Sequence, residues 1–177
     1  MQYFEIEGGH QLFGEIEPQG AKNEALQVVC AVLLTEEKVV LENVPDILDV
    51  NRLIELLELI GVEVKRLEPG KISFRSKDVK VSSLYTPQFK DAAARLRGSM
   101  MILGPLLARF GEALMPQPGG DKIGRRRVDT HFLGFQELGA HFVYNDKESY
   151  YKVFSHGRLK GNFLHLDTGV RQAGKQT

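Results

Sequence analysis

Hydrophobic and polar residues follow two different patterns along the chain, one typical of strands and one typical of helices. Near the N-terminus, residues 3–7 and 11–17 alternate between apolar and polar on either side of Gly8 and Gly9. Such alternation places the apolar side chains on one face of a strand, and paired glycines favour a tight turn. The pattern therefore predicts a β-hairpin at the N-terminus.

A helical pattern begins after the break at residues 18–20 and starts the first of two similar series of elements. Asp49 is a residue type that caps helix N-termini, and Gly61 is one that ends helices. The first series is predicted as a helix at 21–34, a strand at 38–41, a turn at 43–45, an Asp49-capped helix at 50–60 and a hairpin of strands at 62–67 and 71–75.

The second series has the same order of elements after a longer first helix. A strand-like piece at 79–84 leads to a helix at 91–110, which Pro105 should kink because proline removes a helical hydrogen bond. The elements predicted after this helix are a strand at 113–115, an Asp129-capped helix at 130–138 that Gly139 ends, a hairpin of strands at 140–144 and 150–154, and a last strand at 163–166.

The two series form an internal repeat of about 75 residues, which is longer than the usual solenoid repeats. Each copy is roughly helix–strand–helix–strand–strand, and Ile60-Gly61 in the first copy matches Leu138-Gly139 in the second. Two such copies related by a rotation would bury their helices together and leave their sheets outside. A long loop in the second copy replaces a plain turn in the first, and such a replacement is a good place to look for function.

This loop, residues 115–129, combines prolines, glycines, one acid between the glycines and a run of arginines. Its two prolines and three glycines exclude a continuous helix or strand and allow hinging. Asp121 lies between the glycines, and residues 125–127 are all arginine. The combination suggests a lid that carries a proton donor over an anionic, phosphate-bearing substrate. A solvated surface turn with a charge run is the alternative.

Other basic residues have two interpretations as well. Lys22 lies at a predicted helix N-terminus, where its charge opposes the helix macrodipole, and an unfavourable local choice is a mild indication of function. A solvated lysine at such a position is nevertheless common. Arg95 and Arg97 precede Gly98-Ser99, and both arginines could simply lie on a solvated helix face.

Composition bounds the class of protein. The chain has 177 residues, of which 42% are hydrophobic, and its formal net charge is zero. These values predict one domain, or one and a part, with no global field that would favour nucleic acid or a membrane surface. Cys30 is the only cysteine and lies in an apolar helical run, so a core role in a reducing compartment is expected. The N-terminus lacks the features of a signal peptide, which predicts a cytoplasmic location.

Five groups of residues occur in order between residue 1 and about residue 167. They are GAKNEAL at 20–26, NVP at 43–45 with Asp49-Val50, RGS at 97–99 with LGPL at 103–106, PGGDKIG at 118–124 with Arg126, Val128, Asp129 and His131, and GRLKG at 157–161. Together these motifs resemble the UDP-N-acetylglucosamine 1-carboxyvinyltransferases of the enolpyruvyl transferase family.

The resemblance implies an α/β fold, namely an inside-out α/β barrel of repeated βαβαββ units with the helices inside, here incomplete. It implies that the N-terminal hairpin, residues 1–21, packs on a second domain and that residues 22–167 form about two repeats of the first domain. The polar tail at 168–177 departs from the family, as a truncation or a shifted reading frame would produce. Interior surface left uncovered would then favour self-association.

The resemblance also implies an activity. The family transfers enolpyruvate from phosphoenolpyruvate to the 3-hydroxyl of UDP-N-acetylglucosamine, the first committed step of peptidoglycan synthesis, and no metal or cofactor is expected. Asp121 matches the proton donor, Lys22 the lysine that contacts phosphoenolpyruvate, and Arg126 the arginine that grips its phosphate or carboxylate. The positions that match sugar-nucleotide contacts are Asn23, Arg97, Arg126, Arg127, Val128, Asp129 and Thr130.

Two departures and two alternatives qualify this expectation. Most members carry cysteine where this chain has Asp121, and many carry proline where it has Arg127. An aspartate can still give a proton, but it offers no thiolate to alkylating inhibitors such as fosfomycin. The alternatives are an enolpyruvylshikimate phosphate synthase-like transferase and a non-catalytic UDP-sugar-binding half-protein. A half-site with no opposing wall is expected to turn over little or no substrate.

Overall fold

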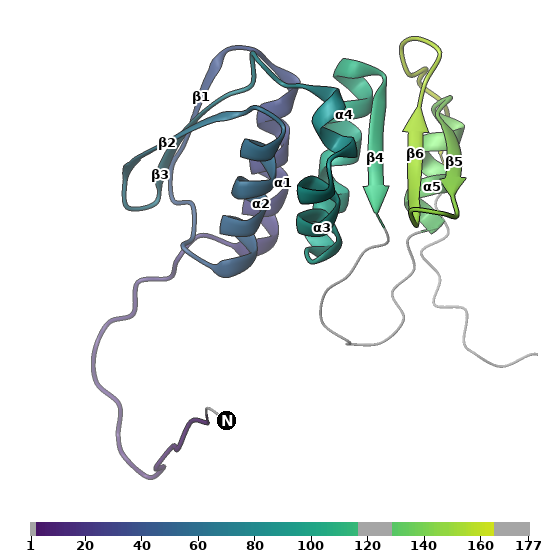
Figure 1. The fold of residues 1–177 in the computed structure, drawn as a ribbon. Helices are drawn as coiled ribbons and strands as arrows, with labels where there is room; N and C mark the ends of the chain where they lie inside the picture. The colour runs from purple at the N-terminus through teal and green to yellow at the C-terminus, as the bar shows by residue number, and fades with distance from the viewer. Residues whose placement is uncertain (1–2, 117–128, 165–177) are drawn as a thin grey trace, which may run out of the picture.

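The computed structural model describes residues 3–116 and 129–164, and two similar α/β units make up most of this part of the chain (Figure 1). The first unit consists of α1 (Lys22–Ala31), the short 3-10 helix η1 (Val32–Leu34), β1 (Lys38–Leu41), α2 (Leu48–Leu59), β2 (Glu63–Glu68) and β3 (Lys71–Arg75). The linking helices are η2 (Val81–Tyr85), α3 (Pro87–Ala94) and η3 (Arg97–Ile102). The second unit consists of α4 (Leu103–Phe110), β4 (Glu112–Pro116), α5 (Asp129–Glu137), β5 (His141–Asn145) and β6 (Tyr150–Phe154).

The two sheets have the same topology, which confirms the predicted repeat. Each is antiparallel, with strand orders β1-β3-β2 and β4-β6-β5, so the last strand of each unit lies in the centre. Val39 of β1 pairs with Phe74 of β3, and Ala113 of β4 pairs with Val153 of β6. In both central strands the paired residue is fully buried, so each sheet turns an apolar face inward.

Helices α1 to α4 lie inside and the two sheets outside, as predicted, whereas α5 packs on its own sheet through Phe132 against Phe142 and Tyr151. Figure 1 shows α1, α2, α3 and α4 between the two sheets. The core is correspondingly helical: Leu53, Ile54 and Leu57 of α2 are almost completely buried, as is Leu106 of α4. In contrast, β2 exposes five of its six residues and only Val64 is partly covered. Burial of the helix faces against one another is therefore the main source of hydrophobic stabilisation.

The predicted N-terminal hairpin is not formed. The structure has no strand between residues 3 and 17, and the apolar side chains there are exposed, for example Phe4 and Ile16 at 98% and 94%. Figure 1 shows the segment running away from the body of the molecule. An isolated two-stranded hairpin is only marginally stable in water, and here no surface covers its apolar face. Its packing on a second domain stays a prediction.

The linking region differs from the predicted strand and single long helix. Residues 81–85 form the 3-10 helix η2 and not a strand, and the backbone N–H of Lys80, just before η2, donates to the carbonyl of Ile60 (N···O 2.8 Å). The helix predicted at 91–110 is three helices, and the break falls at Leu96, which is extended. The hydroxyl of Ser99 donates to the last-turn carbonyl of Ala93 at 2.8 Å and so satisfies the end of α3. Pro105 does not kink a helix, because it lies in the first turn of α4, where no backbone donor is needed.

The last predicted strand is also absent where it can be checked, since residues 163 and 164 are in no strand and residues 165 and 166 lie outside the described residues. The 168–177 tail lies outside them as well.

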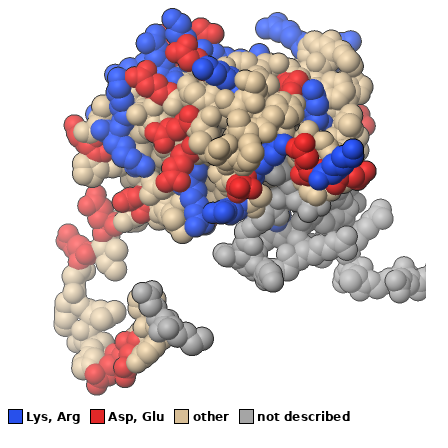
Figure 2. Space-filling model, in the orientation of Figure 1, with Lys and Arg blue, Asp and Glu red and all other residues tan. Residues whose placement is uncertain are grey.

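Charges of both signs cover the surface. Figure 2 shows lysine and arginine side chains interspersed with aspartate and glutamate on the face in view. This agrees with the zero net charge and with the absence of a single-sign field on that face. Among the described helices, none combines the length and the apolar character that a membrane span requires.

Candidate functional site

Lys22 and Asn23 form the first turn of α1, and the Lys22 ammonium pairs with the carboxylate of Asp49 in the first turn of α2. The side chain of Lys22 is half exposed and that of Asp49 is about one-third exposed. The lysine charge that opposes the macrodipole of α1 thus has a compensating carboxylate from a neighbouring helix. Because half of the lysine side chain remains accessible, its ammonium can also meet an anion from solvent.

Asp49 is not the N-cap of α2, contrary to the sequence prediction. The cap position is Ile47, whose side chain cannot accept a hydrogen bond, and Asp49 is the second residue of the helix. Asp129 is likewise not an N-cap, because it is the first residue of α5 itself. An acid in the first helical turn still complements the dipole. Because the side chain of Asp49 does not cap its own helix, it is available to contact Lys22. Sequence reasoning missed the pair, because capping preference suggested a local role for Asp49.

A close backbone contact fixes the start of α1 next to the turn that leads into α2. A Cβ atom on Gly20 would collide with the carbonyl oxygen of Asn43 and lie 3.1 Å from Cδ of Pro45. Asn43 itself has a φ of 56°, in the left-handed region that asparagine tolerates better than most residues. Lys22 and Asp49 therefore extend from two helix starts that the backbone holds in a fixed relation.

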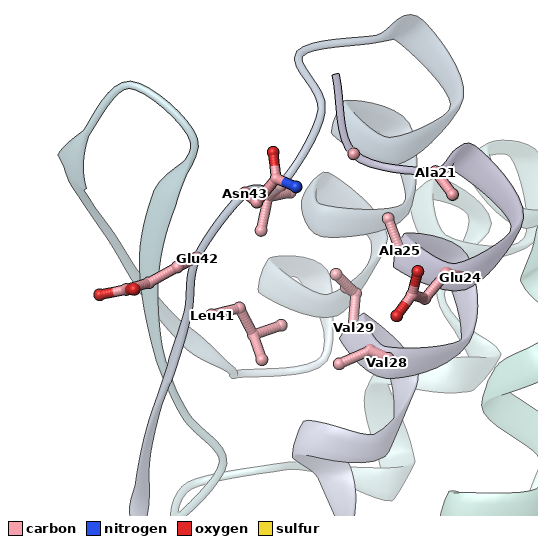
Figure 3. A pocket seen from close by; sticks show the side chains of 10 residues that line it. Ala21, Glu24, Ala25, Val28, Val29, Leu41, Glu42 and Asn43 are labelled. Atoms are coloured by element: carbon pink, nitrogen blue, oxygen red, sulfur yellow. The ribbon is translucent and has the colours of Figure 1, made fainter. Parts of the chain in front are cut away.

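A hollow of about 130 Å³ lies between α1 and the end of β1 (Figure 3). Its lining includes apolar Ala25, Val29 and Leu41, with the acids Glu24 and Glu42 beside them. A hydrogen bond and ion pair with Lys71 (Nζ–Oε1 2.7 Å) lower the pKa of Glu42 below its ordinary value. Because the lining contributes acids and no cation, the hollow is unsuited to a phosphate-bearing ligand.

Arg97 begins η3 close to α1. Its neighbour Gly98 lies so near Leu26 that an added Cβ would be 3.4 Å from both δ-carbons of that leucine. Leu26 is one turn beyond Lys22 on α1. The contact between Gly98 and Leu26 therefore places the start of η3 against the helix that carries Lys22 and Asn23, and Arg97 there is partly exposed.

The strand that leads to the long loop is held firmly on the helices. Ala113 and Leu114 of β4 are buried. The hydroxyl of Tyr85 donates to the carboxylate of Glu112, whose second oxygen lies 3.2 Å from Nζ of Lys152. Burial raises the pKa of Tyr85, and the hydrogen bond and charge of Glu112 raise it further. Glu112 therefore ties β4 to η2 through Tyr85 and to β6 through Lys152.

The predicted loop residues fall partly outside and partly inside the described part of the chain. Asp121, Arg126, Arg127 and Val128 lie outside the described residues. Asp129 begins α5 and Thr130 follows it, partly exposed. Thr130 belongs to α5 and Lys22 to α1, and Figure 1 shows α5 with β5 and β6 on the far side of α4 from α1.

Two further kinds of candidate, a metal site and the single cysteine, can be assessed among the described residues. Within 3–116 and 129–164, no three histidine, cysteine, aspartate or glutamate side chains group in a way that could hold a metal ion. Burial raises the pKa of Cys30 to about 12, so this thiol stays protonated and acts as a small core residue, as predicted.

The fold and this arrangement define the chain as part of an enolpyruvyl transferase-type inside-out α/β domain. Its fold is similar to that of the enolpyruvyl transferase NikO from Streptomyces tendae, with a TM-score of 0.68 and 19% identity over 86% of this chain and 32% of that one. EPSP synthase from Acinetobacter baumannii gives a TM-score of 0.60 at 16% identity, over 90% of this chain and 36% of that one.

Sequence comparison gives the family. The model of the EPSP synthase (3-phosphoshikimate 1-carboxyvinyltransferase) family matches residues 6–173, and the chain belongs to this family of transferases. A UDP-N-acetylglucosamine 1-carboxyvinyltransferase of Bacteroides fragilis is 52% identical over 167 residues, which are 94% of this chain and 38% of the relative. The corresponding protein of Porphyromonas gingivalis is 49% identical over the same shares. The chain therefore spans a little over a third of the length of these relatives.

Proposed function

We propose that this chain is the N-terminal part of an enzyme that transfers enolpyruvate from phosphoenolpyruvate to the 3-hydroxyl of UDP-N-acetylglucosamine. The observation that carries the proposal is the accessible start of α1, which holds Lys22 and Asn23, in a chain that is 52% identical to a protein of that name. The role would be in peptidoglycan synthesis in the cytoplasm, and hence in cell shape and division.

The chemistry requires cations for the phosphate of phosphoenolpyruvate and a proton for its carbon 3. Lys22 supplies an ammonium on a side chain that is half exposed. Arg97 and Asn23 would contact the sugar nucleotide, together with Arg126, Arg127, Val128, Asp129 and Thr130. Asp121 would deliver the proton when the loop closes over both substrates, since closure brings a donor and excludes water.

Turnover by the 177-residue chain alone is expected to be very low. The relatives are more than twice as long, so the opposing wall of the site would come from residues that this chain does not contain. Catalysis of this kind depends on a site that excludes water on all sides. Binding without turnover is therefore the appropriate measurement, and the apolar surface exposed in the fragment would favour self-association.

The test is calorimetric titration of the 177-residue chain with UDP-N-acetylglucosamine and, separately, with shikimate 3-phosphate. The proposal predicts saturable binding of the sugar nucleotide only. An enolpyruvylshikimate phosphate synthase-like role is the second candidate, favoured by the name of the family model and by the solved EPSP synthase fold. Preference for shikimate 3-phosphate would establish that candidate and overturn the first.

A further inference from the structure

The Lys22–Asp49 ion pair joins the first turns of two different helices, and both turns are anchored. The contact of Gly20 with Asn43 fixes the start of α1. At α2, the backbone of Asn51 donates to Ile47 (N···O 3.0 Å). The amide of Asn51 also donates to Asp46 at 2.7 Å. Asp49 therefore presents its carboxylate from a scaffold with little freedom to move.

This pair differs from an ordinary surface ion pair. Lys65 and Glu63, at 2.6 Å, lie two residues apart on one strand, where both side chains are largely exposed. Such exposed pairs contribute little to stability. The Lys22–Asp49 pair is also partly exposed, so its main consequence is for the position of the ammonium and not for the stability of the fold.

An ammonium has three donor hydrogens on a long flexible stem. One hydrogen directed at Asp49 leaves the others for a phosphate or a carboxylate oxygen. A lysine that is already ordered loses less conformational freedom when it binds an anion than a freely rotating one. The negative charge of Asp49 would repel that anion, but the ammonium lies in contact with the carboxylate and solvent screens the remainder.

We propose that Asp49 is a positioning residue that holds the Lys22 ammonium ready for an anionic enol phosphate. The inference rests on the proposed function, in which Lys22 contacts phosphoenolpyruvate. It assigns a role to a carboxylate that touches Lys22 and is not itself required to touch the substrate. The alternative hypothesis is that Asp49 only occupies the Lys22 ammonium, so that the anion must displace it before it can bind.

The first measurement needs no ligand. NMR relaxation of the lysine ε-methylene groups in the full 177-residue chain reports how ordered each lysine is. Lys22 should be ordered in the wild type, become mobile in Asp49→Asn and recover in part in Asp49→Glu, which retains a carboxylate. The matched control is Glu63→Gln, which should leave Lys22 unchanged. A Lys22 side chain that is equally mobile with and without the Asp49 carboxylate would overturn the inference.

The second measurement is the affinity of the same chain for phosphoenolpyruvate in the presence of UDP-N-acetylglucosamine. Loss of preorganisation should weaken binding about three- to tenfold in Asp49→Asn, with recovery in Asp49→Glu. The double variant Lys22→Asp/Asp49→Lys restores an ion pair of reversed direction, so it should keep the stability of the wild type yet bind more weakly. Equal or tighter binding by Asp49→Asn would show that Asp49 only competes for Lys22.

The two failures can be told apart. If the wild type binds neither ligand, the proposed function is contradicted, and the ordering of Lys22 still decides whether Asp49 positions it. If both ligands bind and Lys22→Gln weakens phosphoenolpyruvate, the proposed function stands. An unchanged affinity in Asp49→Asn would then overturn the positioning role alone.

Discussion

Gly61 and Gly139 occupy equivalent corners of the two units. Both have strongly positive φ angles, 99° and 92°, and each follows a residue whose carbonyl accepts a hydrogen bond from a lysine backbone, Lys80 at 2.8 Å and Lys160 at 2.9 Å. The surroundings differ, because a Cβ on Gly61 would lie 2.5 Å from the carbonyl oxygen of Asp78, whereas none of the described atoms lies within 4 Å of the equivalent position on Gly139.

These corners predict unequal effects of the same substitution. Gly139→Ala should destabilise the fold by about 1–2 kcal/mol, because alanine disfavours positive φ. Gly61→Ala has the same conformational cost and a backbone collision, which should add about 1–3 kcal/mol. Urea unfolding of both variants measures the difference. Equal losses would mean that Asp78 can move aside without cost.

Arg109 links the two units through backbone carbonyls. Its Nη1 donates to Ser76, Leu33 and Thr35 at 2.8, 2.9 and 3.2 Å, and its side chain is only 15% exposed. Arg109→Met should destabilise the chain by about 3 kcal/mol, because several largely buried carbonyls lose a charged donor. Arg109→Lys should recover only part, since an ammonium lacks the planar fork of donors.

Glu36 provides the control for Arg109. It pairs with Nη2 of Arg109 at 3.1 Å but is 65% exposed. Glu36→Gln should therefore change the free energy of unfolding by less than about 1 kcal/mol. A loss as large as that of Arg109→Met would contradict the view that the carbonyl contacts, and not the ion pair, join the units.

Tyr85 should make stability depend on pH in the alkaline range. Burial, followed by the hydrogen bond to Glu112, raises the pKa of Tyr85 above its ordinary value of 10.0. The folded state then binds the phenolic proton more tightly than the unfolded state does. The stabilising contribution is complete below about pH 10 and declines as the pH rises above it.

Tyr85→Phe isolates this contribution. The variant should lose about 1 kcal/mol near neutral pH, because Glu112 loses a hydrogen-bond donor. Its stability should also fall less steeply than that of the wild type between about pH 10 and 11. Unfolding measured across this range for both proteins gives the comparison, and identical slopes would exclude Tyr85 as the titrating group.

The aspartate at position 121 predicts resistance to fosfomycin. The chain contains one cysteine, Cys30, and its thiol is buried and protonated. Mass spectrometry should therefore detect no adduct on the wild type after incubation with this epoxide together with UDP-N-acetylglucosamine. Asp121→Cys introduces a thiol into an arginine-rich loop and should form the adduct, whereas Asp121→Ser should not. An adduct on the wild-type chain would refute the prediction.

Much of the fold could be predicted because most elements of each repeat are determined by patterns within a few neighbouring residues. The structure confirms most of the predicted helices, the glycines that follow their ends, and the hairpin that closes each unit, β2–β3 in the first and β5–β6 in the second. The errors arose where tertiary contacts decide. The predicted long helix is interrupted at Leu96, where Ser99 bonds to the end of α3, and residues 81–85 form η2 instead of a strand. The apolar N-terminal side chains are exposed, so the predicted hairpin has no surface to pack on.

The site could be predicted only in part. The unfavourable helix position of Lys22 indicated function, but nothing in the sequence pattern identifies Asp49 as its partner, because the contact depends on how two helices are placed. The placement in turn depends on Gly20 and Asn43, which look like ordinary turn residues until the backbone contact is seen. The loop pattern suggests Asp121 as a proton donor and the family resemblance implies the same role, which stays a prediction because Asp121 lies outside the described residues.

The most direct test of the account compares Lys22→Gln with Lys65→Gln in calorimetric titrations of the 177-residue chain. Both variants remove one partly exposed ammonium, so they change the net charge equally. Lys22→Gln should weaken phosphoenolpyruvate binding about tenfold or more in the presence of UDP-N-acetylglucosamine, while Lys65→Gln should not change it. Equal affinities for phosphoenolpyruvate in the wild type and Lys22→Gln would contradict the account.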